Sequence, residues 1–148
     1  MRKAIFLLPL WLGLMLAPAW ASTMNSIGKD RVKVHSRPDA KSPVVFQAGL
    51  GYPIEIERRQ NNWVYCRDWK KKAGWVYQPL VSNIQTAVIT VANAKVRKGP
   101  GSRQPVVLQA SRGEIFRVFG AKGPWVKIGY YLENEPVGWV RHDLVWGD

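Results

Sequence analysis

Residues 34–81 of this 148-residue chain match residues 96–145 when the two stretches are laid over each other. Valines, prolines, glycines and a tryptophan recur 62 positions later, as Trp63 and Trp125 do, and a two-residue insertion then moves the offset to 64. A unit of this length written twice predicts two copies of one small fold. The repeat therefore constrains the architecture more than any other feature of the chain.

The first 21 residues read as a secretory signal peptide. Arg2 and Lys3 form a positive segment, residues 5–16 are apolar, and the stretch ends in Ala19-Trp20-Ala21, a small-x-small cleavage pattern. The apolar run is short for a membrane span, which takes about 20 residues. We therefore expect cleavage after Ala21 and an exported protein, periplasmic or secreted, with no stable membrane insertion afterwards.

The chain is strongly basic, with a net charge of +12 that becomes +10 once Arg2 and Lys3 are removed. Residues 24–81 carry +6 and residues 87–148 carry +4. A field of this sign favours anionic partners such as cell-wall carboxylates, lipid headgroups or polyanionic saccharides. Export makes nucleic acid the least favoured of the anionic partners, and we expect none.

No stretch of the repeats shows sustained helical periodicity, and prolines interrupt every candidate helix. Strands this short must curl into small barrels to hide their edges and share a core. We expect an all-β protein of two barrels, residues 22–81 and 87–148, whose short linker (residues 82–86) makes them touch through Ile84. In the second repeat we expect about five strands, at 90–97, 105–108, 115–119, 125–128 and 138–141, then a helical turn and a last short strand at 142–145.

The second repeat contains three ordered motifs: Val96-Arg97-Lys98-Gly99-Pro100-Gly101-Ser102, Trp125-Val126-Lys127-Ile128 and Gly138-Trp139-Val140. They resemble the bacterial SH3 pattern of a V-R-x-G-P-G loop, a W-V-K-V strand and a closing G-W-V. The first repeat resembles a diverged copy, with Arg37 and Asp39 in place of the two loop glycines. The resemblance covers about 110 residues and implies two tandem SH3-like β-barrels that bind cell-wall peptide, glycan or a protein partner.

The loops that differ between the copies are candidates for specific binding. Residues 67–72 set Trp69 among four cations and one acid, whereas residues 129–135 are aromatic and acidic. An aromatic ring can stack on a sugar or peptide while neighbouring cations hold a carboxylate or phosphate. Two other interpretations stay open: Trp69 folds back onto its own barrel, or the basic loop docks on the acidic one.

Four tryptophans occur at matched positions, Trp63 with Trp125 and Trp75 with Trp139. Barrel packing explains them, and so does a groove wall, because an indole at a barrel rim can pack its ring and still present its N–H. If the proline-containing loop lines a groove, the two copies should not bind the same ligand equally, and the second is the more typical binder. The candidate ligand-binding residues are Trp69, Lys70, Lys71, Arg97, Lys98, Trp125, Tyr130, Tyr131 and Trp139.

The sequence gives no support for a catalytic or metal-binding site. There is no serine elbow, H-E-x-x-H motif or cysteine cluster, and the two histidines are His35, in the first proline-containing loop, and His142, near the C-terminus. Cys66 follows Val64 by two residues, so we expect it on the same buried face, with a reactive or intermolecular thiol as the alternative. We therefore expect no enzyme activity, no metal and no cofactor.

Together these features predict an exported, non-catalytic protein whose tandem barrels bind peptidoglycan or another anionic envelope polymer. Two alternatives stay open. The barrels could serve as a periplasmic protein–protein adaptor or inhibitor, or as the targeting subunit of a separate cell-wall hydrolase.

Overall fold

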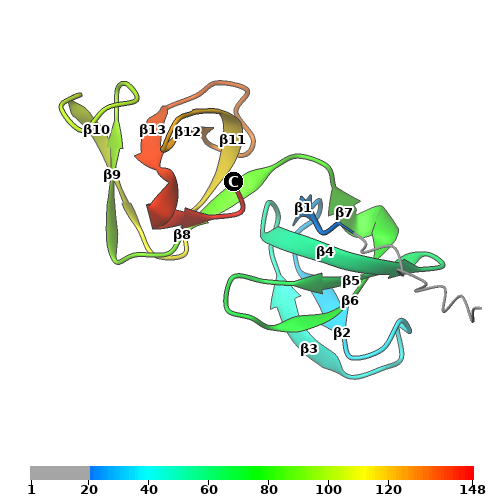
Figure 1. The fold of residues 1–148 in the computed structure, drawn as a ribbon. Coiled ribbons are helices and arrows are strands. Elements are labelled where there is room, and N and C mark those ends of the chain that lie inside the picture. The colour runs from blue at the N-terminus through cyan, green and yellow to red at the C-terminus, as the bar shows by residue number, and fades with distance from the viewer. Residues whose placement is uncertain (1–20) are drawn as a thin grey trace, which may run out of the picture.

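The computed structural model describes residues 21–148, so the predicted signal peptide lies outside the described residues except for Ala21. All regular structure in this part of the chain is β-strand apart from two short 3-10 turns, which confirms the expected all-β class. Figure 1 shows two barrels side by side, one from each repeat. No helix of the described part is long and apolar enough to cross a membrane.

The first barrel is a seven-stranded antiparallel sheet in the order β3-β2-β6-β5-β4-β1-β7. Its strand β1 pairs with β4 on one side and with β7 on the other, which brings the two ends of the repeat together. Its elements are β1 (Thr23–Ile27), β2 (Val32–His35), β3 (Val44–Ala48), β4 (Pro53–Gln60), β5 (Trp63–Arg67), β6 (Ala73–Tyr77), the 3-10 turn η1 (Gln78–Leu80) and β7 (Val81–Ser82).

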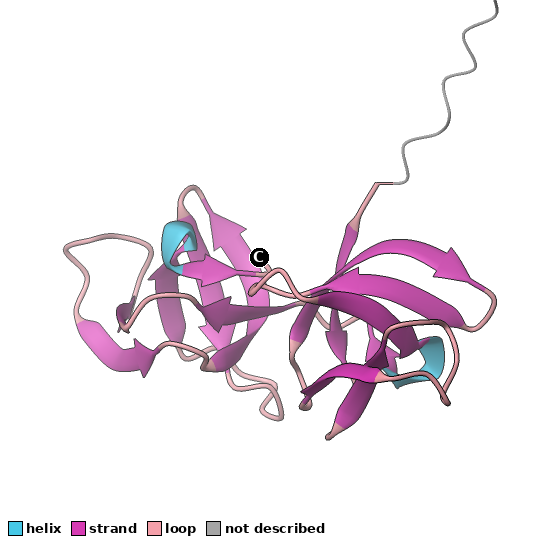
Figure 2. Cartoon of the chain, turned by 90° about the horizontal axis from the view of Figure 1, so that it is seen from below, coloured by secondary structure: helices cyan, strands magenta, loops and turns pink. Residues whose placement is uncertain are grey.

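The second barrel repeats this order, strand for strand, as β10-β9-β13-β12-β11-β8-β14. In both barrels a 3-10 turn stands just before the last short strand, as Figure 2 shows in cyan. The elements are β8 (Thr86–Ile89), β9 (Asn93–Arg97), β10 (Val106–Ser111), β11 (Ile115–Lys122), β12 (Trp125–Gly129), β13 (Gly138–Arg141), the 3-10 turn η2 (His142–Leu144) and β14 (Val145–Trp146).

Two strand predictions need correction. The expected strand 90–97 is interrupted, because Thr90 leaves the sheet after β8 and donates its backbone N–H to the Leu144 carbonyl before β9 begins at Asn93. Strand β11 runs beyond the expected end at Phe119, past a register shift between Val118 and Gly120 that lets it continue alongside β12. The predicted helical turn and last strand at 142–145 are confirmed as η2 and the start of β14.

The two cores are built from matched positions, because alternate residues of each strand point inward. Strand β5 shows the pattern: Val64 and Cys66 are fully buried, and Trp63 and Tyr65 face outward. The prediction that Cys66 is a buried hydrophobe is therefore confirmed. Matched core pairs include Ile27 with Ile89, Val34 with Val96, Ala48 with Ala110, Ile54 with Phe116, Val64 with Val126, Cys66 with Ile128, and Val76 with Val140.

The same backbone turn precedes β4 in the first barrel and β11 in the second. Gly51 has φ 80° and Gly113 has φ 89°, both in the left-handed region that favours glycine. Gly51 donates its N–H to Ile27 at 2.7 Å, and Gly113 donates to Ile89 at 2.8 Å. The glycine repeat in the sequence thus corresponds to a repeated hydrogen bond, which ties the turn to the end of β1 in the first barrel and of β8 in the second.

The two barrels touch, as the short linker predicts. The buried Thr86 hydroxyl of the second barrel donates to the Gly51 carbonyl of the first at 2.7 Å. The Tyr131 ring lies against the same glycine, where an added Cβ would come within 2.9 Å of it. Ile84 contributes its carbonyl oxygen, which accepts a hydrogen bond from Ser26 at 2.7 Å. Figure 1 places the C-terminus near this junction.

Candidate functional site

The first barrel carries a groove of about 540 Å³ on its outer surface. Segments far apart in the chain meet there: the turn before β2, strand β2 itself, the following loop, the start of β5, the end of β6 and η1. Concave, largely apolar sites with a few polar groups are where small ligands bind. The lining residues are Lys29, Asp30, Arg31, Val32, Lys33, His35, Ala40, Trp63, Tyr77 and Leu80.

Three aromatic side chains form the wall of this groove. Trp63 and Tyr77 face each other across the β5–β6 pair, with ring centroids 5.6 Å apart. His35, at the end of β2, meets Trp63 edge-on at 5.8 Å. Tyr77 is 41% exposed, so part of its ring is free to contact a ligand.

The rim of the groove is basic. Lys29, Arg31 and Lys33 line it, with Asp30 as the one acid among the lining residues. Arg31 and Asp30 approach each other at 3.8 Å, but both are well exposed, so this ion pair neutralises little. An apolar aromatic wall with a positive rim suits a sugar or peptide that carries an anionic group.

His35 was expected in the proline-containing loop, but it is the last residue of β2, and the loop that follows positions its side chain. It ends β2 and is buried, and its Nδ1 lies 3.0 Å from the Ser42 carbonyl oxygen. The buried Ser42 hydroxyl also donates to the Asp39 carbonyl at 2.6 Å, which holds the loop closed. The first barrel thus builds its proline-containing loop without the glycines of the second.

An equivalent groove of about 240 Å³ exists in the second barrel. Each residue that lines it is the repeat counterpart of one that lines the first groove, so the repeat has preserved a groove as well as a core. The lining residues are Asn93, Lys95, Arg97, Ser102, Trp125, Arg141 and Leu144.

The two grooves differ in chemistry. Arg97 stands where the first barrel has His35, and Arg141 stands where it has Tyr77. The shared tryptophan, Trp125, is 8% exposed. The second groove therefore presents cations around one indole edge, whereas the first presents a row of rings.

A second aromatic cluster continues the outer face of the first barrel. Tyr65 and Trp75 pair across β5 and β6 with ring centroids 5.4 Å apart. The Arg58 guanidinium lies over the Tyr65 ring at 4.2 Å, a cation–π contact. On the corresponding face of the second barrel, the Lys127 ammonium lies 5.6 Å from the Trp139 ring. Lys127 is the counterpart of Tyr65, so this face has fewer aromatic rings than that of the first barrel, as the groove does.

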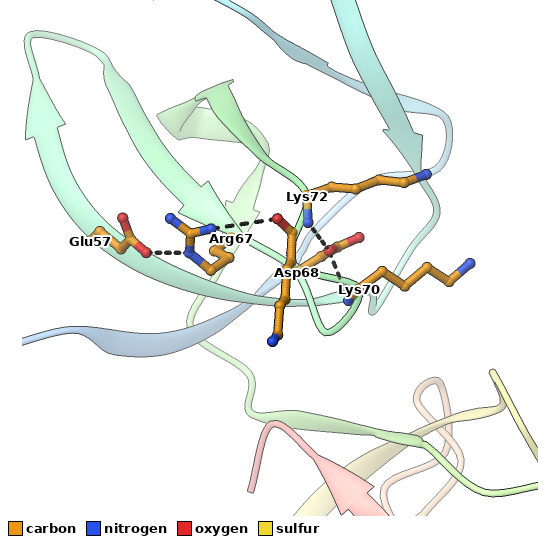
Figure 3. Close-up of polar contacts among 6 residues, drawn as sticks. Glu57, Arg67, Asp68, Lys70 and Lys72 are labelled. Carbon is orange, nitrogen blue, oxygen red and sulfur yellow. Dashed lines mark hydrogen bonds and ion pairs between the residues drawn. The ribbon is translucent and has the colours of Figure 1, made fainter.

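The basic loop between β5 and β6 is held from inside by Asp68, which is 2% exposed (Figure 3). One of its carboxylate oxygens accepts the backbone N–H groups of Lys70 at 2.9 Å and of Lys72 at 2.8 Å. The other accepts the Tyr52 hydroxyl at 2.8 Å. The lysine side chains extend from a loop whose fold depends on a buried acid, as charge-assisted hydrogen bonds of this kind allow.

Trp69 is half-buried beside this loop, and the Lys70 ammonium lies 5.2 Å from its ring. Its indole N–H is buried and completes no hydrogen bond among the described residues, although it lies near enough to the Tyr52 hydroxyl to affect its pKa. Part of this tryptophan thus packs onto its own barrel, one of the two interpretations that the sequence left open for its ring.

Two buried groups of the first barrel have raised pKa values. Burial raises the pKa of the Cys66 thiol to about 12, with a smaller contribution from the Asp68 carboxylate. Burial, together with the hydrogen bond to Asp68, also raises the pKa of Tyr52 above its usual range. A thiol that stays protonated at neutral pH is a poor nucleophile.

The candidate ligand-binding residues predicted from the sequence do not form one site in the structure. Arg97 and Trp125 line the second groove, and Trp139 lies next to Arg97 in the strand register. Lys98 is exposed in the following loop. Trp69, Lys70 and Lys71 belong to the Asp68 loop of the first barrel, outside both grooves.

The two loop tyrosines lie apart from the grooves. Tyr130 is 43% exposed and packs on Phe116 at 5.7 Å, and Tyr131 lies at the junction against Gly51. Within residues 21–148 no ion pair joins the acidic loop to the basic one. The contact between the barrels uses the Tyr131 ring instead of loop charges.

Sequence reasoning did not identify His35 and Tyr77 as groove residues, or Tyr65 as part of the neighbouring aromatic cluster. A signal for the tyrosines was present, because Trp63-Val64-Tyr65 and Trp75-Val76-Tyr77 both place aromatics two residues apart on neighbouring strands. His142 lies in η2 with its Nδ1 3.6 Å from Asp148. Residues 21–148 contain no cluster of three or more His, Cys, Asp or Glu side chains that could hold a metal.

Two family models, both described as the bacterial SH3 domain, match this chain. One matches residues 28–83 and the other residues 92–145. Each match falls on one barrel and includes that barrel's groove tryptophan.

Curated relatives are similar over part of their length. A Bacillus subtilis (strain 168) protein named as a candidate N-acetylmuramoyl-L-alanine amidase, YrvJ, is 23% identical over 130 residues, 80% of this chain and 24% of its own length. A Staphylococcus epidermidis protein named as a candidate cell wall amidase, LytH, is 34% identical over 61 residues, 40% of this chain and 21% of its own length. The chain thus spans about a quarter or less of these relatives.

Solved structures show a weaker likeness. NlpC2 from Trichomonas vaginalis aligns with a TM-score of 0.39 and 14% identity, over 86% of this chain and 49% of that one. An NlpC/P60 family protein from Bacillus cereus aligns with a TM-score of 0.38 and 12% identity, over 84% and 56% of the two chains. Scores this low leave the family assignment to the two sequence matches.

Proposed function

Because this chain belongs to the bacterial SH3 domain family over residues 28–83 and 92–145, we propose that it is a non-catalytic binding module for peptidoglycan. The observation that carries the proposal is the repeated groove, an indole wall with a basic rim in both barrels. Peptidoglycan offers sugar rings for the aromatic wall and free carboxylates for the cations.

Two further observations support the cell wall as the target. The two relatives described above are named as an N-acetylmuramoyl-L-alanine amidase and a cell wall amidase, and this chain matches only a minor part of each of them. The net positive charge attracts an acidic polymer over a long range. Because two linked sites bind one polymer more tightly than either alone, weak single grooves are sufficient.

The test is co-sedimentation of residues 22–148 with purified peptidoglycan sacculi at low and high salt. We expect saturable pelleting that persists at high salt, because exposed charge–charge attraction is screened there and ring contacts are not. Loss of pelleting at high salt would mean only that a basic protein adheres to a polyanion, and would contradict the proposal.

Matched variants separate the groove from other surfaces. Tyr77→Ala should weaken pelleting by about tenfold if the ring stacks on the ligand, a loss typical of an aromatic contact. Tyr130→Ala removes a tyrosine of similar exposure outside the groove and tests the loop site predicted from the sequence. Leu132→Ser alters an exposed apolar residue of that loop as a control. If Tyr130→Ala weakens pelleting and Tyr77→Ala does not, the binding site lies in the loop of residues 129–135 and not in the groove.

The names of the relatives also favour a second candidate, the targeting unit of a cell-wall hydrolase. In that role the barrels would hold a separate catalytic domain on its substrate. The check is whether adding this protein raises the rate at which a wall amidase solubilises sacculi, and whether Tyr77→Ala removes the increase.

A further inference from the structure

We propose that the groove of the second barrel is a carboxylate subsite, in which Arg97 and Arg141 bind the acid group of a ligand whose apolar part lies on Trp125. The inference rests on the proposed function and gives the two grooves different roles. The first groove would hold a larger part of a wall fragment against its aromatic rings, and the second would hold a free carboxylate of its peptide stem.

The strand order brings the cations of this groove together. Strands β9, β13 and β12 are neighbours, and the register pairs Arg97 with Trp139 and Arg141 with Trp125. Lys95 lies two residues before Arg97 on β9 and therefore on the same face. Three cations line the groove and no acid does, whereas the first groove includes Asp30.

The guanidinium groups of Arg97 and Arg141 are each oriented by one contact and still have N–H groups available for a ligand. Arg97 donates from Nη1 to the Gln104 carbonyl at 2.9 Å, which fixes its side chain and leaves its other N–H groups available. Arg141 lies 3.1 Å from the Asp143 carboxylate, in an exposed pair that a ligand carboxylate can replace or extend. Asp143 shows that a planar acid group fits the guanidinium at this rim.

The size of the groove fits a small acid group. Its volume of about 240 Å³ is less than half that of the first groove, and an arginine stands at its wall in place of His35. Trp125, which is nearly buried, offers an indole edge instead of a broad ring face. A carboxylate on a short aliphatic stem fits within these dimensions.

The first test uses glutarate, a simple dicarboxylate, and glutaramide, its uncharged diamide. The indole N–H signal of Trp125, assigned with Trp125→Phe, is followed by NMR while each compound is added at 0.3 M salt. We expect saturable shifts with glutarate and none with glutaramide. Equal responses to both, or no response to glutarate, would overturn the inference.

Matched charge variants identify the residues. Arg97→Gln with Arg141→Gln should weaken glutarate binding by about tenfold or more, since two charge-assisted contacts are lost. Arg112→Gln with Arg117→Gln removes the same charge from the same barrel, outside the groove, and should leave binding unchanged. If both pairs weaken binding alike, the effect is net charge and the subsite does not exist.

The repeat itself supplies an exchange experiment. Arg97→His with Arg141→Tyr gives the second groove the side chains of the first and should remove glutarate binding while the barrel stays folded, as its amide spectrum would show. His35→Arg with Tyr77→Arg should in turn create a glutarate response at Trp63. Retained glutarate binding in the first exchange would contradict the role of the arginines.

A wall fragment separates this inference from the proposed function. We compare a muropeptide bearing free stem carboxylates with the same fragment after amidation, and expect the amidated form to bind about tenfold more weakly. Equal binding of the two forms would sink the subsite and leave wall binding intact. Glutarate binding without any muropeptide or sacculus binding would sink the proposed function and keep the subsite. A shift with inorganic phosphate as large as that with glutarate would overturn the assignment to carboxylate.

Discussion

The two barrels of this protein share a core and differ at their grooves. Valines and isoleucines recur at the same buried positions, and both barrels contain the same glycine hydrogen bond between their first strand and a turn. At the groove, His35 and Tyr77 of the first barrel are replaced by Arg97 and Arg141. Core positions carry similar side chains in the two repeats. Several groove positions carry chemically different side chains, although they occupy equivalent places in the two barrels.

That contrast separates two kinds of matched residue. Trp63 and Trp125 are matched and also line grooves, so identity between the copies does not by itself mean a core role. The positions most informative about binding are those that line the groove in both barrels but carry different side chains. Under the proposed function, differences between equivalent sites in one chain correspond to different ligand groups.

The largest expected effects come from the cores. Phe116→Ala should lower the free energy of unfolding of the second barrel by about 3–5 kcal/mol, and Ile54→Ala should lower that of the first by about 2–5 kcal/mol, because each leaves a cavity in a close-packed core. Urea unfolding, with hydrogen exchange to assign each barrel, measures both. If either substitution unfolds both barrels together, the junction couples them more strongly than its few contacts suggest.

The second largest effect should be a loss of stability at alkaline pH that is greater in the first barrel than in the second. Cys66 ionises near 9 in the unfolded chain and near 12 in the fold, so the unfolded state loses its proton first and stability falls as pH rises between these values. Tyr52 acts in the same direction. We expect the first barrel to lose on the order of 2–4 kcal/mol over this range.

The control for that prediction lies in the repeat. The second barrel has Ile128 and Glu114 at the positions of Cys66 and Tyr52, so it should lose less stability over the same range. Cys66→Val should flatten the response of the first barrel. Parallel pH profiles for the two barrels, measured by unfolding at each pH, would contradict the assignment.

The smallest expected effect is at the junction. Tyr131→Ala removes the ring that lies on Gly51 and should lower stability by no more than about 1 kcal/mol, since this ring is only half-buried. It should, however, let the barrels reorient, which ¹⁵N relaxation detects as two different correlation times. Tyr130→Ala, on the same loop but packed on its own barrel, is the matched comparison. Unchanged tumbling after Tyr131→Ala would show that the remaining contacts, among them the Thr86 hydrogen bond, are enough to fix the junction.

Much of the fold was predictable from the sequence because the repeat, the turn glycines and the alternation in strands such as β5 are local patterns. The grooves were not, since His35, Trp63, Tyr77 and Leu80 lie on separate elements and meet only once strand order is known. Trp125 and Arg97 were predicted individually, but their neighbour Arg141 was not. A short pattern shows that a residue recurs and does not show which distant residue stands beside it.

Asp68 has a consequence for how the first barrel can vary. Its carboxylate holds the backbone N–H groups of Lys70 and Lys72, so the loop's shape does not depend on the lysine side chains. A further demand is at Lys71, whose φ of 65° suits glycine or asparagine at least as well. With an acid kept at position 68, this loop is a natural place to display a different recognition sequence on an unchanged barrel.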